Sequence, residues 1–311
     1  MKDALFYSPE EIAKLLKISK GTVYELLRRG DIPSYRVGKQ IRVSQADLQL
    51  YMHASDLPTK PPNTKIQVSL EKMIIENQGL IICGQDIILD ILTRYLEKHN
   101  PMLRSLRSYV GSLDGLLALY KGTANITATH LWDGETGEYN IPYVRRLLPG
   151  QRTVIINLVY RTIGFYVAPG NPHAIYDWAD LQEPNITIIN RDKGSGTRVL
   201  LDEHLRNLNI DSRNIKGYEN EEMSHIAVAS AVARGMADVG LGTEKAALQV
   251  DEVEFVPLSK ERYDLVLYRN DLEKSNFQTL LSILNSAEFK EEVDGMGGYD
   301  TARMGEIIAE L

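Results

Sequence analysis

One short stretch rich in proline divides the chain into two parts. Residues 53–65 read HASDLPTKPPNTK and contain three prolines. Proline fixes one backbone dihedral angle and removes a hydrogen-bond donor, so such a stretch forms neither a helix interior nor a central strand. We therefore predict a semi-rigid linker over residues 55–66, between a small domain at 1–54 and a larger domain at 67–311.

Charge is distributed unequally between the two parts. The chain of 311 residues has a formal net charge of −7. Residues 1–65 carry 11 Lys and Arg against 7 Asp and Glu, whereas the remainder carries 24 against 35. A basic small domain joined to an acidic large one indicates that only the small domain meets nucleic acid.

Several protein classes are excluded by composition. The single cysteine, Cys83, follows the apolar run LII and is expected to be buried; it rules out an intramolecular disulfide and a cysteine-based metal cluster. The N-terminal sequence MKDALFYSPEE has no apolar core of a secretory signal. No apolar run approaches the roughly 18 residues that span a membrane. We therefore expect a cytoplasmic protein without a membrane partner.

The small domain begins with two helix signals close together. Ser8 and Glu11 make a capping box at the start of a helix that continues as IAKLL, in which the isoleucine and the leucines share one face. Ser19 then caps a second helix, and Gly30 ends it. Two helices separated by a tight turn are typical of a helix–turn–helix motif.

A hairpin and a third helix follow. The sequence SYRVGKQIRVS, residues 34–44, alternates around Gly38-Lys39, and Ser44 caps the helix QADLQLYM. This order of elements over residues 5–53 resembles the excisionase and MerR-like winged helix–turn–helix family. The resemblance implies that the small domain binds double-stranded DNA.

Eight polar side chains are the candidate DNA contacts. The second helix of such a motif enters the major groove with its N-terminal residues towards the bases, where we expect Thr22 and Tyr24 to read bases while Val23 packs inside. Basic side chains suit phosphates, which position the protein without specifying sequence. The alternative that these charges only solvate a surface stays open. The full set is Ser19, Lys20, Thr22, Tyr24, Arg28, Arg36, Lys39 and Arg42.

From Ile66 onward the pattern alternates between strands and helices, which indicates an α/β fold with parallel sheets. The last forty residues read as helices with a loop at 295–300. We expect strands at 80–84, 105–112, 125–131, 151–172 (one long strand or two), 185–190, 237–242, 253–258 and 262–269, and helices at 86–100, 113–122, 197–208, 224–235 and 243–249.

Four stretches of the large domain carry a second resemblance. They are ICGQDIILDIL, YVGSLDGLLAL, GFYVAPGNP, and NRDKGSGTRVLLDEHL with the later SHIAVASAVARGMADVGLG. Residues 67–311 resemble type II periplasmic-binding-protein domains of the group related to molybdate- and tungstate-binding proteins. The resemblance implies two lobes joined by crossing strands, with the ligand between helix N-termini, where free N–H groups and partial positive charge suit an anion.

The candidate ligand contacts lie at strand-to-helix junctions. Glycines there let the backbone approach a ligand, and hydroxyls donate hydrogen bonds. Arg198 either contacts the ligand or braces its loop. The set is Gln85, Asp86, Gly111, Ser112, Thr129, His130, Gly194, Ser195, Gly196, Thr197, Arg198 and Ser224.

Asp86 departs from the molybdate-binding pattern, which usually places a small hydroxyl residue in the first loop. An ionised Asp86 repels an oxyanion unless it caps the following helix, which is the commoner role of Asp there. The alternative is a ligand with amine or hydroxyl groups. Trp132 and Asp133 would then contact a pterin-like or purine-like ring, or Trp132 is a buried rim residue.

Catalytic motifs are missing. The stretch RDKGSGTR, residues 191–198, is neither a Walker motif nor a nucleophile elbow. Only His130 and His225 lie near predicted cleft loops, and neither has an orienting acid at a telling spacing. The acidic stretch 133–138 does not match a calcium loop and reads as a flexible surface insertion. We expect no enzyme, no cofactor and no metal site.

The sequence therefore predicts a one-component transcriptional regulator. A homodimer would read two half-sites, and the effector implied by resemblance is an oxyanion, molybdate or tungstate. Three alternatives stay open: a cytoplasmic substrate-binding protein without a regulatory role, a molybdenum-cofactor-related enzyme or pterin-binding protein, and an architectural DNA-bending role for the small domain.

Overall fold

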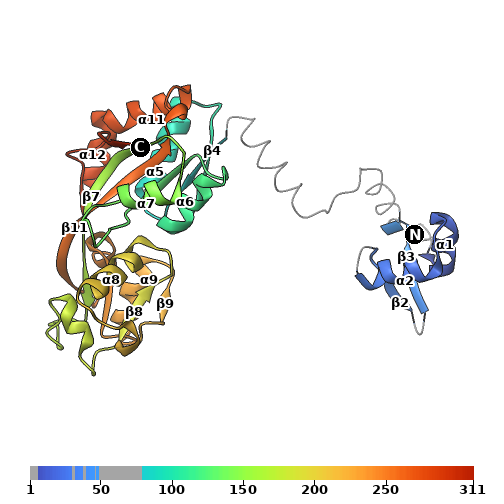
Figure 1. Cartoon of the computed structure of the whole chain (residues 1–311), viewed down its shortest axis with the longest axis horizontal. Coiled ribbons are helices and arrows are strands. Elements are labelled where there is room, and N and C mark those ends of the chain that lie inside the picture. Colours follow the sequence, from blue (N-terminus) through green and yellow to red (C-terminus); the bar gives the residue numbers. More distant parts are fainter. Residues whose placement is uncertain (1–5, 30–31, 38–39, 46, 49–78) are drawn as a thin grey trace. The chain divides into compact units, whose positions relative to one another are not determined.

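The computed structural model describes residues 6–29, 32–37, 40–45, 47–48 and 79–311. The chain divides into two compact units, residues 1–69 and 70–311, which are described separately below (Figure 1). The linker predicted at 55–66 lies outside the described residues. No helix among the described residues combines the length and the apolar character needed to cross a bilayer.

The first unit is a helix pair against a small sheet. Helices α1 (Pro9–Leu16) and α2 (Lys20–Arg29) pack beside strands β1 (Phe6–Tyr7), β3 (Gln40–Ser44) and β2 (Tyr35–Val37), which pair antiparallel in the order β1-β3-β2. Its buried apolar residues are Ile12, Val23, Leu26, Ile32, Val43 and Leu48.

Local capping explains where these helices start. Ser8 accepts a hydrogen bond from the Glu11 backbone, and Glu11 reaches back to the Ser8 backbone, so the predicted capping box is confirmed. Ser19 accepts a hydrogen bond from the backbone N–H of Thr22 at 3.1 Å. Of the third predicted helix, residues 45 and 47–48 are helical and the rest lies outside the described residues.

The second unit is built on one mixed sheet, with strands in the order β5-β4-β6-β11-β7-β10-β8-β9, and β12 and β13 paired to β7. The strands are β4 (Gly79–Cys83), β5 (Arg104–Ser108), β6 (Ile126–Thr129), β7 (Thr153–Val167), β8 (Ile188–Arg191), β9 (Glu221–Glu222), β10 (Val239–Thr243), β11 (Glu254–Tyr268), β12 (Tyr299–Asp300) and β13 (Ile307–Glu310). The helices are α5 (Ile88–His99), α6 (Ser112–Tyr120), α7 (Ile141–Leu147), α8 (Gly196–Asn207), α9 (His225–Ala233), α10 (Glu244–Ala247), α11 (Ser275–Asn285) and α12 (Ala287–Gly295), with short 3-10 turns at Trp178–Gln182, Ser212–Asn214 and Arg269–Asp271.

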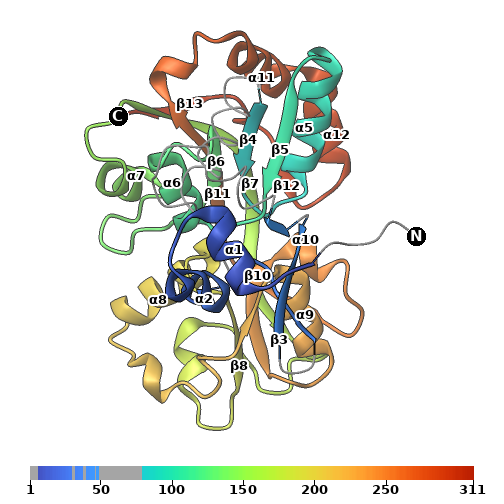
Figure 2. The same ribbon diagram turned by 90° about the vertical axis from the view of Figure 1, so that its right-hand side faces the viewer.

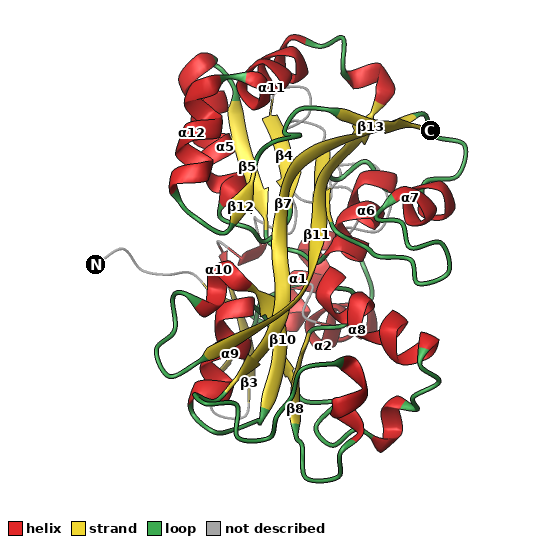
Figure 3. Cartoon of the chain, turned by 90° about the vertical axis from the view of Figure 1, so that its left-hand side faces the viewer, coloured by secondary structure: helices red, strands yellow, loops and turns green. Residues whose placement is uncertain are grey.

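Strands β7 and β11 run through the whole unit and divide it into two lobes (Figure 3). The first half of β7 packs in one core with β4, α5, α11 and α12, and its second half packs in another with β8, α8 and β10. We call residues 79–159 and 263–311 lobe 1, and residues 163–258 lobe 2. Figure 2 shows α5 and α12 in lobe 1, and α8 and α9 in lobe 2.

The structure corrects four element predictions. The sheet is mixed, because β11 pairs antiparallel with both β6 and β7. β11 is one strand where two were predicted, because polar residues at its centre interrupt the apolar pattern of the sequence. Its pairing with β7 shifts register near Pro257 and near Tyr263. The chain ends in β13, where a helix was predicted, because residues 307–310 pair with β7. The strand predicted at 105–112 ends at Ser108, since Gly111 already caps α6.

Candidate ligand-binding site

A small cavity lies between the two lobes, at the level where β7 and β11 cross from one to the other. Its volume is about 30 Å³. A single water needs about 10 to 15 Å³ by the same measure, so the cavity has room for one small ion or a few waters. Its lining residues are Gly84, Gln85, Asp86, Val110, Gly111, Ser112, Ala128, His130, Arg161, Arg191, Ser195, Gly196, His225 and Tyr263.

Four helix N-termini converge on this cavity. Helices α5 and α6 come from lobe 1, and α8 and α9 from lobe 2; each has at least nine residues. Gly111 is the N-cap of α6, Ser195 is the N-cap of α8, and His225 is the first residue of α9. The first N–H groups of a helix have no partner within it and carry partial positive charge. The arrangement therefore favours an anion.

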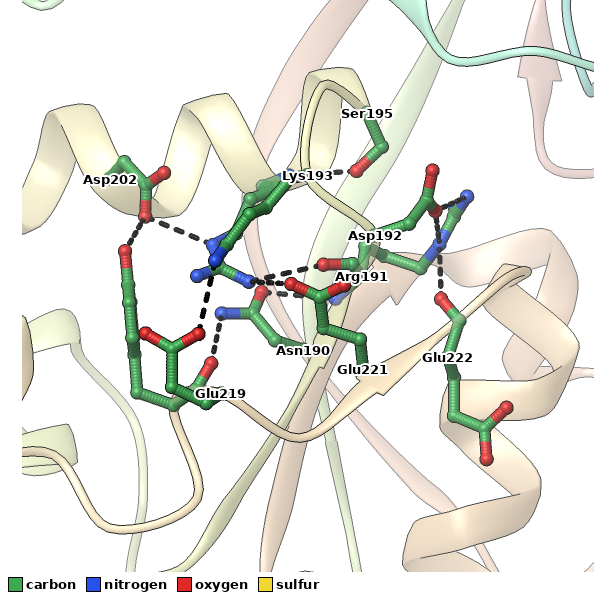
Figure 4. Close-up of polar contacts among 11 residues, drawn as sticks. Asn190, Arg191, Asp192, Lys193, Ser195, Asp202, Glu219, Glu221 and Glu222 are labelled. Carbon is green, nitrogen blue, oxygen red and sulfur yellow. Dashed lines mark hydrogen bonds and ion pairs between the residues drawn. The ribbon is translucent and has the colours of Figure 1, made fainter.

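Arg191 adds a buried positive charge from the end of β8. Its side chain is 2% exposed and donates to the Asp192 carboxylate at 2.8 Å and to the Gln85 side-chain oxygen at 2.6 Å. The backbone oxygen of Glu222 accepts a further hydrogen bond from it (Figure 4), and so does that of Met223. Because Gln85 belongs to lobe 1, Arg191 ties the lobes together at the cavity.

Arg161 lies at the centre of β7 and is held by two carboxylates. Its Nε donates to Glu261 at 2.6 Å and its Nη1 to Asp86 at 2.5 Å. Burial alone would lower the pKa of Arg161, but the two carboxylates outweigh burial and raise it. Burial likewise opposes ionisation of Glu261, yet Arg161 and His130 lower the pKa of Glu261 to about 2. Both partners are therefore charged, and Arg161 is largely neutralised.

Asp86 has three hydrogen-bond partners besides any ligand. Its Oδ1 accepts from the backbone N–H of Ile88 at 3.0 Å and from the Tyr299 hydroxyl at 2.6 Å, while Oδ2 accepts from Arg161. The helix-capping role is therefore present, and Arg161 balances the charge. The repulsion that an ionised Asp86 would exert on an anion is reduced accordingly.

Two histidines face the cavity in different states of pairing. His130 Nδ1 is 2.9 Å from the ionised Glu261, which fixes the Nδ1–H tautomer when the ring is neutral. Nδ1 of His225 is buried without a hydrogen-bond partner. Burial lowers the pKa of both rings, and nearby Arg191 and Arg161 lower that of His225 further.

Two serine hydroxyls complete the polar lining. Ser195 accepts a hydrogen bond from the backbone N–H of Arg198 at 3.3 Å, and Ser112 accepts one from the backbone N–H of His130 at 3.4 Å. Each oxygen accepts from the protein, so each O–H is able to donate to a ligand oxygen. The position of Ser195 at the start of α8 is as expected, and its role as a donor to the ligand stays a prediction.

The structure brings seven predicted residues to the cavity and places five elsewhere. Gln85, Asp86, Gly111, Ser112, His130, Ser195 and Gly196 line it. Gly194 lies beside it, where its carbonyl accepts a hydrogen bond from the backbone of Leu113 across the lobes at 3.1 Å. Ser224 caps α9. The hydroxyl oxygens of Thr129 and Thr197 are buried and have no hydrogen-bond partner among the described residues.

Arg198 is a brace. Its guanidinium bonds to Asp202, Glu221 and the backbone oxygen of Arg191, and it stacks on the Tyr218 ring at 4.1 Å. All of these partners belong to lobe 2. Of the two roles left open by the sequence, the described contacts support bracing, because Arg198 does not line the cavity.

Sequence reasoning missed Arg161, Arg191 and Tyr263 as lining residues, and it named His225 only as lying near a predicted cleft loop. Arg161 carried a usable signal, since a charge inside the apolar run INLVYRTIGFYV of a buried strand needs partners. Its partner Glu261 follows 100 residues later, a pairing that no local pattern reveals. Glu261 is also the orienting acid of His130 that the sequence did not show. Among the described residues, no serine hydroxyl hydrogen-bonds the His130 ring.

The alternative contacts of the acidic loop are also placed. Trp132 stacks on His204 of lobe 2 with ring centroids 4.4 Å apart, and Asp133 is buried within its own loop. Neither lines the cavity. Residues 133–138, which were predicted to be a flexible insertion, are linked by hydrogen bonds from the backbones of Glu135 and Thr136 to the Asp133 carboxylate.

Five of the eight candidate DNA contacts lie on α2 or directly before it, namely Ser19, Lys20, Thr22, Tyr24 and Arg28. Val23 is buried, as expected, while Thr22, Tyr24 and Arg28 are exposed. Lys20 pairs with Glu10 of α1 and lies 5.9 Å from the Tyr24 ring centroid, and the Ser19 and Thr22 hydroxyls bond to each other at 2.8 Å. Arg42 is half-buried on β3, and Arg36 is placed only as a residue of β2. Lys39 lies outside the described residues.

Comparisons with known proteins agree with this architecture. Residues 93–285 match the family model of the PBP superfamily domain, and residues 6–55 match that of a helix-turn-helix domain. Protein YvgK of Bacillus subtilis (strain 168) is 41% identical over 314 residues, covering all of both chains.

Two solved structures share the fold of the second unit. One, from Clostridium perfringens, is assigned to phosphate ABC transport as a substrate-binding protein and holds phosphate (TM-score 0.54, 14% identity, 71% of this chain and 98% of that one). The other is an ABC-type phosphate transport receptor from Vibrio cholerae (TM-score 0.50, 19% identity, 71% and 99%).

Proposed function

The chain belongs to the PBP superfamily domain family and carries an N-terminal helix-turn-helix domain, and from this we propose that it is a DNA-binding transcriptional regulator that senses a small oxyanion. The helix-turn-helix unit would bind DNA, and the two-lobed unit would bind the effector. The ligand we propose first is molybdate or tungstate.

The observation that carries the proposal is the convergence of α5, α6, α8 and α9 on one cavity together with Arg191. Helix N-termini from both lobes and the Arg191 guanidinium all donate hydrogen bonds and carry positive charge. Together they are complementary to an anion bound between the lobes. Ser112 and Ser195 supply hydroxyl donors. A ligand that contacts both lobes binds the closed arrangement more tightly than an open one, which is the requirement for a ligand-driven conformational change.

The size of the cavity favours an inorganic anion over a fused ring. A volume of about 30 Å³ suits a compact ion, whereas a pterin needs a cavity the size of a drug-binding pocket, about 300 Å³ or more. Phosphate in the Clostridium perfringens structure is another compact tetrahedral anion, and it supports the class of ligand. We therefore rank a pterin-handling enzyme below an oxyanion sensor.

A homodimer is part of the proposal. A single helix-turn-helix unit covers little DNA surface, so two copies reading two half-sites are expected. Opening and closing of the lobes would then alter how the paired DNA-binding units are presented.

Ligand panels test the sensing step directly. Thermal unfolding of the full chain should be followed with sodium molybdate, tungstate, sulfate, phosphate and a pterin, each at several concentrations. We expect molybdate or tungstate to raise the melting temperature, because a ligand at a hundredfold excess over its Kd stabilises the native state by about 2.7 kcal/mol. A shift with the pterin alone would replace the oxyanion proposal by the cofactor-handling one, and no shift with any anion would refute the oxyanion.

A further inference from the structure

We propose that residues 132–139 of lobe 1 form a latch that holds the lobes closed, and that Trp132 is the residue that sets ligand affinity without touching the ligand. This latch loop follows β6 and reaches α8 of lobe 2. None of its contacts with lobe 2 lies in the cavity. The inference goes beyond the proposed function, because it does not depend on what the cavity binds.

The latch loop is preformed by its own hydrogen bonds. The backbone N–H of Asp133 donates to the Glu138 oxygen at 2.9 Å, and that of Gly137 donates to the Asp133 oxygen at 2.8 Å. The carboxylate of Asp133, a residue that is 4% exposed, accepts from two further backbone N–H groups, and Trp132 pairs with Tyr139 as an antiparallel bridge. A loop ordered in this way presents Trp132 at little additional entropic cost.

Trp132 enters a stack of three rings. Its indole lies 4.4 Å from the His204 ring at an interplanar angle of 9°, and the other face of His204 lies 4.1 Å from Trp178 at 10°. Trp178 is fixed in turn by an edge contact with Phe165. Trp132 thus belongs to lobe 1 by sequence but packs against the core of lobe 2.

Gly134 adds two polar contacts to the same helix. Its N–H donates to the Glu203 carboxylate at 2.8 Å, and its carbonyl accepts from the Asn207 side chain at 2.8 Å. A Cβ at position 134 would lie 2.6 Å from the Glu203 carboxylate oxygen and 2.9 Å from the Asn207 amide nitrogen, so alanine here would displace the ends of the two side chains that make these contacts. Both peptide groups of Gly134 are therefore satisfied by lobe 2.

The same two segments, the stretch that follows β6 in lobe 1 and helix α8 in lobe 2, contribute to both the latch and the cavity. His130 lines the cavity two residues before Trp132, and Ser195 lines it at the start of the helix that carries His204. Nine residues of helix separate Ser195 from His204 and span about 14 Å, and Trp132 does not line the cavity. Because α8 is rigid over this length, contact at the latch favours contact at the cavity.

The latch affects ligand affinity through the equilibrium between open and closed lobes. The affinity for a ligand that requires closed lobes falls in proportion to the fraction of molecules that are closed. A latch that favours closure before the ligand arrives raises this fraction. Removing it would lower ligand affinity about tenfold, equivalent to about 1.4 kcal/mol.

The decisive measurement is interlobe distance in the full chain without any anion. Lys121→Cys in lobe 1 and Asn214→Cys in lobe 2 replace exposed residues and carry spin labels; the natural Cys83 is buried. Trp132→Ala should add a population at longer distance to the distribution of the parent. The matched control is Tyr176→Ala, which removes an aromatic ring that is 64% exposed on lobe 2; it should leave the distribution unchanged.

A second variant separates the latch from general packing. Gly134→Ala keeps both tryptophans and disturbs only the contacts with α8, so it should also populate the longer distance. If Trp132→Ala and Gly134→Ala both give the parental distribution, the latch proposal is wrong. Titration with sodium molybdate comes afterwards: weaker binding by both variants supports the latch, and unaltered affinity contradicts it. Absence of molybdate binding by the parent would count against the oxyanion alone, since the distance measurement stands without it.

Discussion

Arg191 and Arg198 lie at the two ends of the stretch RDKGSGTR, and only Arg191 reaches the cavity. The two side chains are almost equally buried, at 2% and 3% exposure. Arg191 bonds across the lobes to Gln85, whereas the partners of Arg198 all lie within lobe 2. Arg191 thus lines the candidate binding site, whereas Arg198 stabilises the structure of lobe 2.

Substitution of each arginine by glutamine should separate these roles. Arg191→Gln removes a charged donor to the anion, worth about 1.5 to 3 kcal/mol, so the Kd for molybdate should rise roughly 10- to 100-fold. Arg198→Gln should mainly lower the melting temperature, because Asp202 and Glu221 lose their partner, with less than about a tenfold effect on Kd. Calorimetric titration and thermal unfolding measure the two effects. Equal losses of affinity without loss of stability would place Arg198 in the site after all.

His225 makes stability depend on pH. Burial lowers its pKa below the usual 6.5, and the charges of Arg191, Arg161 and His130 lower it further. The His225 ring is therefore protonated at a higher pH in the unfolded chain than in the native state. As a result, the free energy of unfolding falls as pH drops below about 6.5, by at most about 1.4 kcal/mol per pH unit for this group. Urea unfolding between pH 5 and 7.5 should show a shallower slope for His225→Gln than for the parent. Parallel curves would contradict the assignment.

At the scale of elements, the N-terminal ends of α6 and α8 touch across the two lobes. A Cβ at Gly111 would lie 2.9 Å from the Gly194 oxygen and 3.0 Å from the Ser195 nitrogen. Gly111 itself has ordinary extended dihedral angles, φ −68° and ψ 170°, which any residue adopts. A larger side chain here therefore disturbs the contact between lobes without straining its own helix.

Gly111→Ala should act as a wedge. We expect the Kd for molybdate to rise at least about tenfold while the melting temperature without ligand changes little, because the two lobe cores remain intact. Gly295→Ala is the control, since its Cβ would meet nothing within 4 Å. Alanine is the better helix former, so this control should be neutral or slightly stabilising. An unchanged Kd for Gly111→Ala would mean that the lobes bind the anion without closing to the observed contact.

The strand-to-helix junctions were predictable because local chemistry marks them. The pairs Gly111-Ser112 and Ser195-Gly196 consist of residue types that favour helix N-termini, so they predict helix starts. Both pairs line the cavity. The part of β7 and β11 that crosses between the lobes was not predictable in this way. Arg161 and Glu261 come from strands far apart in sequence, and the polar centre of β11 made one strand look like two. Pairing of β13 with β7 overrode local helix propensity for the same reason: the decisive contacts are tertiary.

At the scale of the molecule, the boundaries predicted at residues 54 and 67 fall outside the described residues and stay predictions. The proline-rich stretch and the change of charge predict two units, and the chain divides into residues 1–69 and 70–311. The capping residues Ser8 and Ser19 place α1 and α2, with Val23 in the core and Tyr24 on the surface. The effector itself is not encoded in such patterns, because its selection depends on distances between residues from separate strands.

A regulator must couple its two units, and coupling can be measured from either side. If molybdate changes the affinity for DNA by a given factor, DNA must change the affinity for molybdate by the same factor. We expect a factor of about 5 to 150, measured with a DNA fragment selected by the full chain, first as DNA affinity with and without molybdate and then as molybdate affinity with and without DNA. Tyr24→Ala should abolish selective DNA binding and leave molybdate affinity unchanged. Arg28→Gln should weaken binding to all sequences and reduce the slope against salt by about one unit. A factor of one in both directions would make the large unit a binding domain that does not report to the DNA-binding unit, and the regulator proposal would then fail even if molybdate binds.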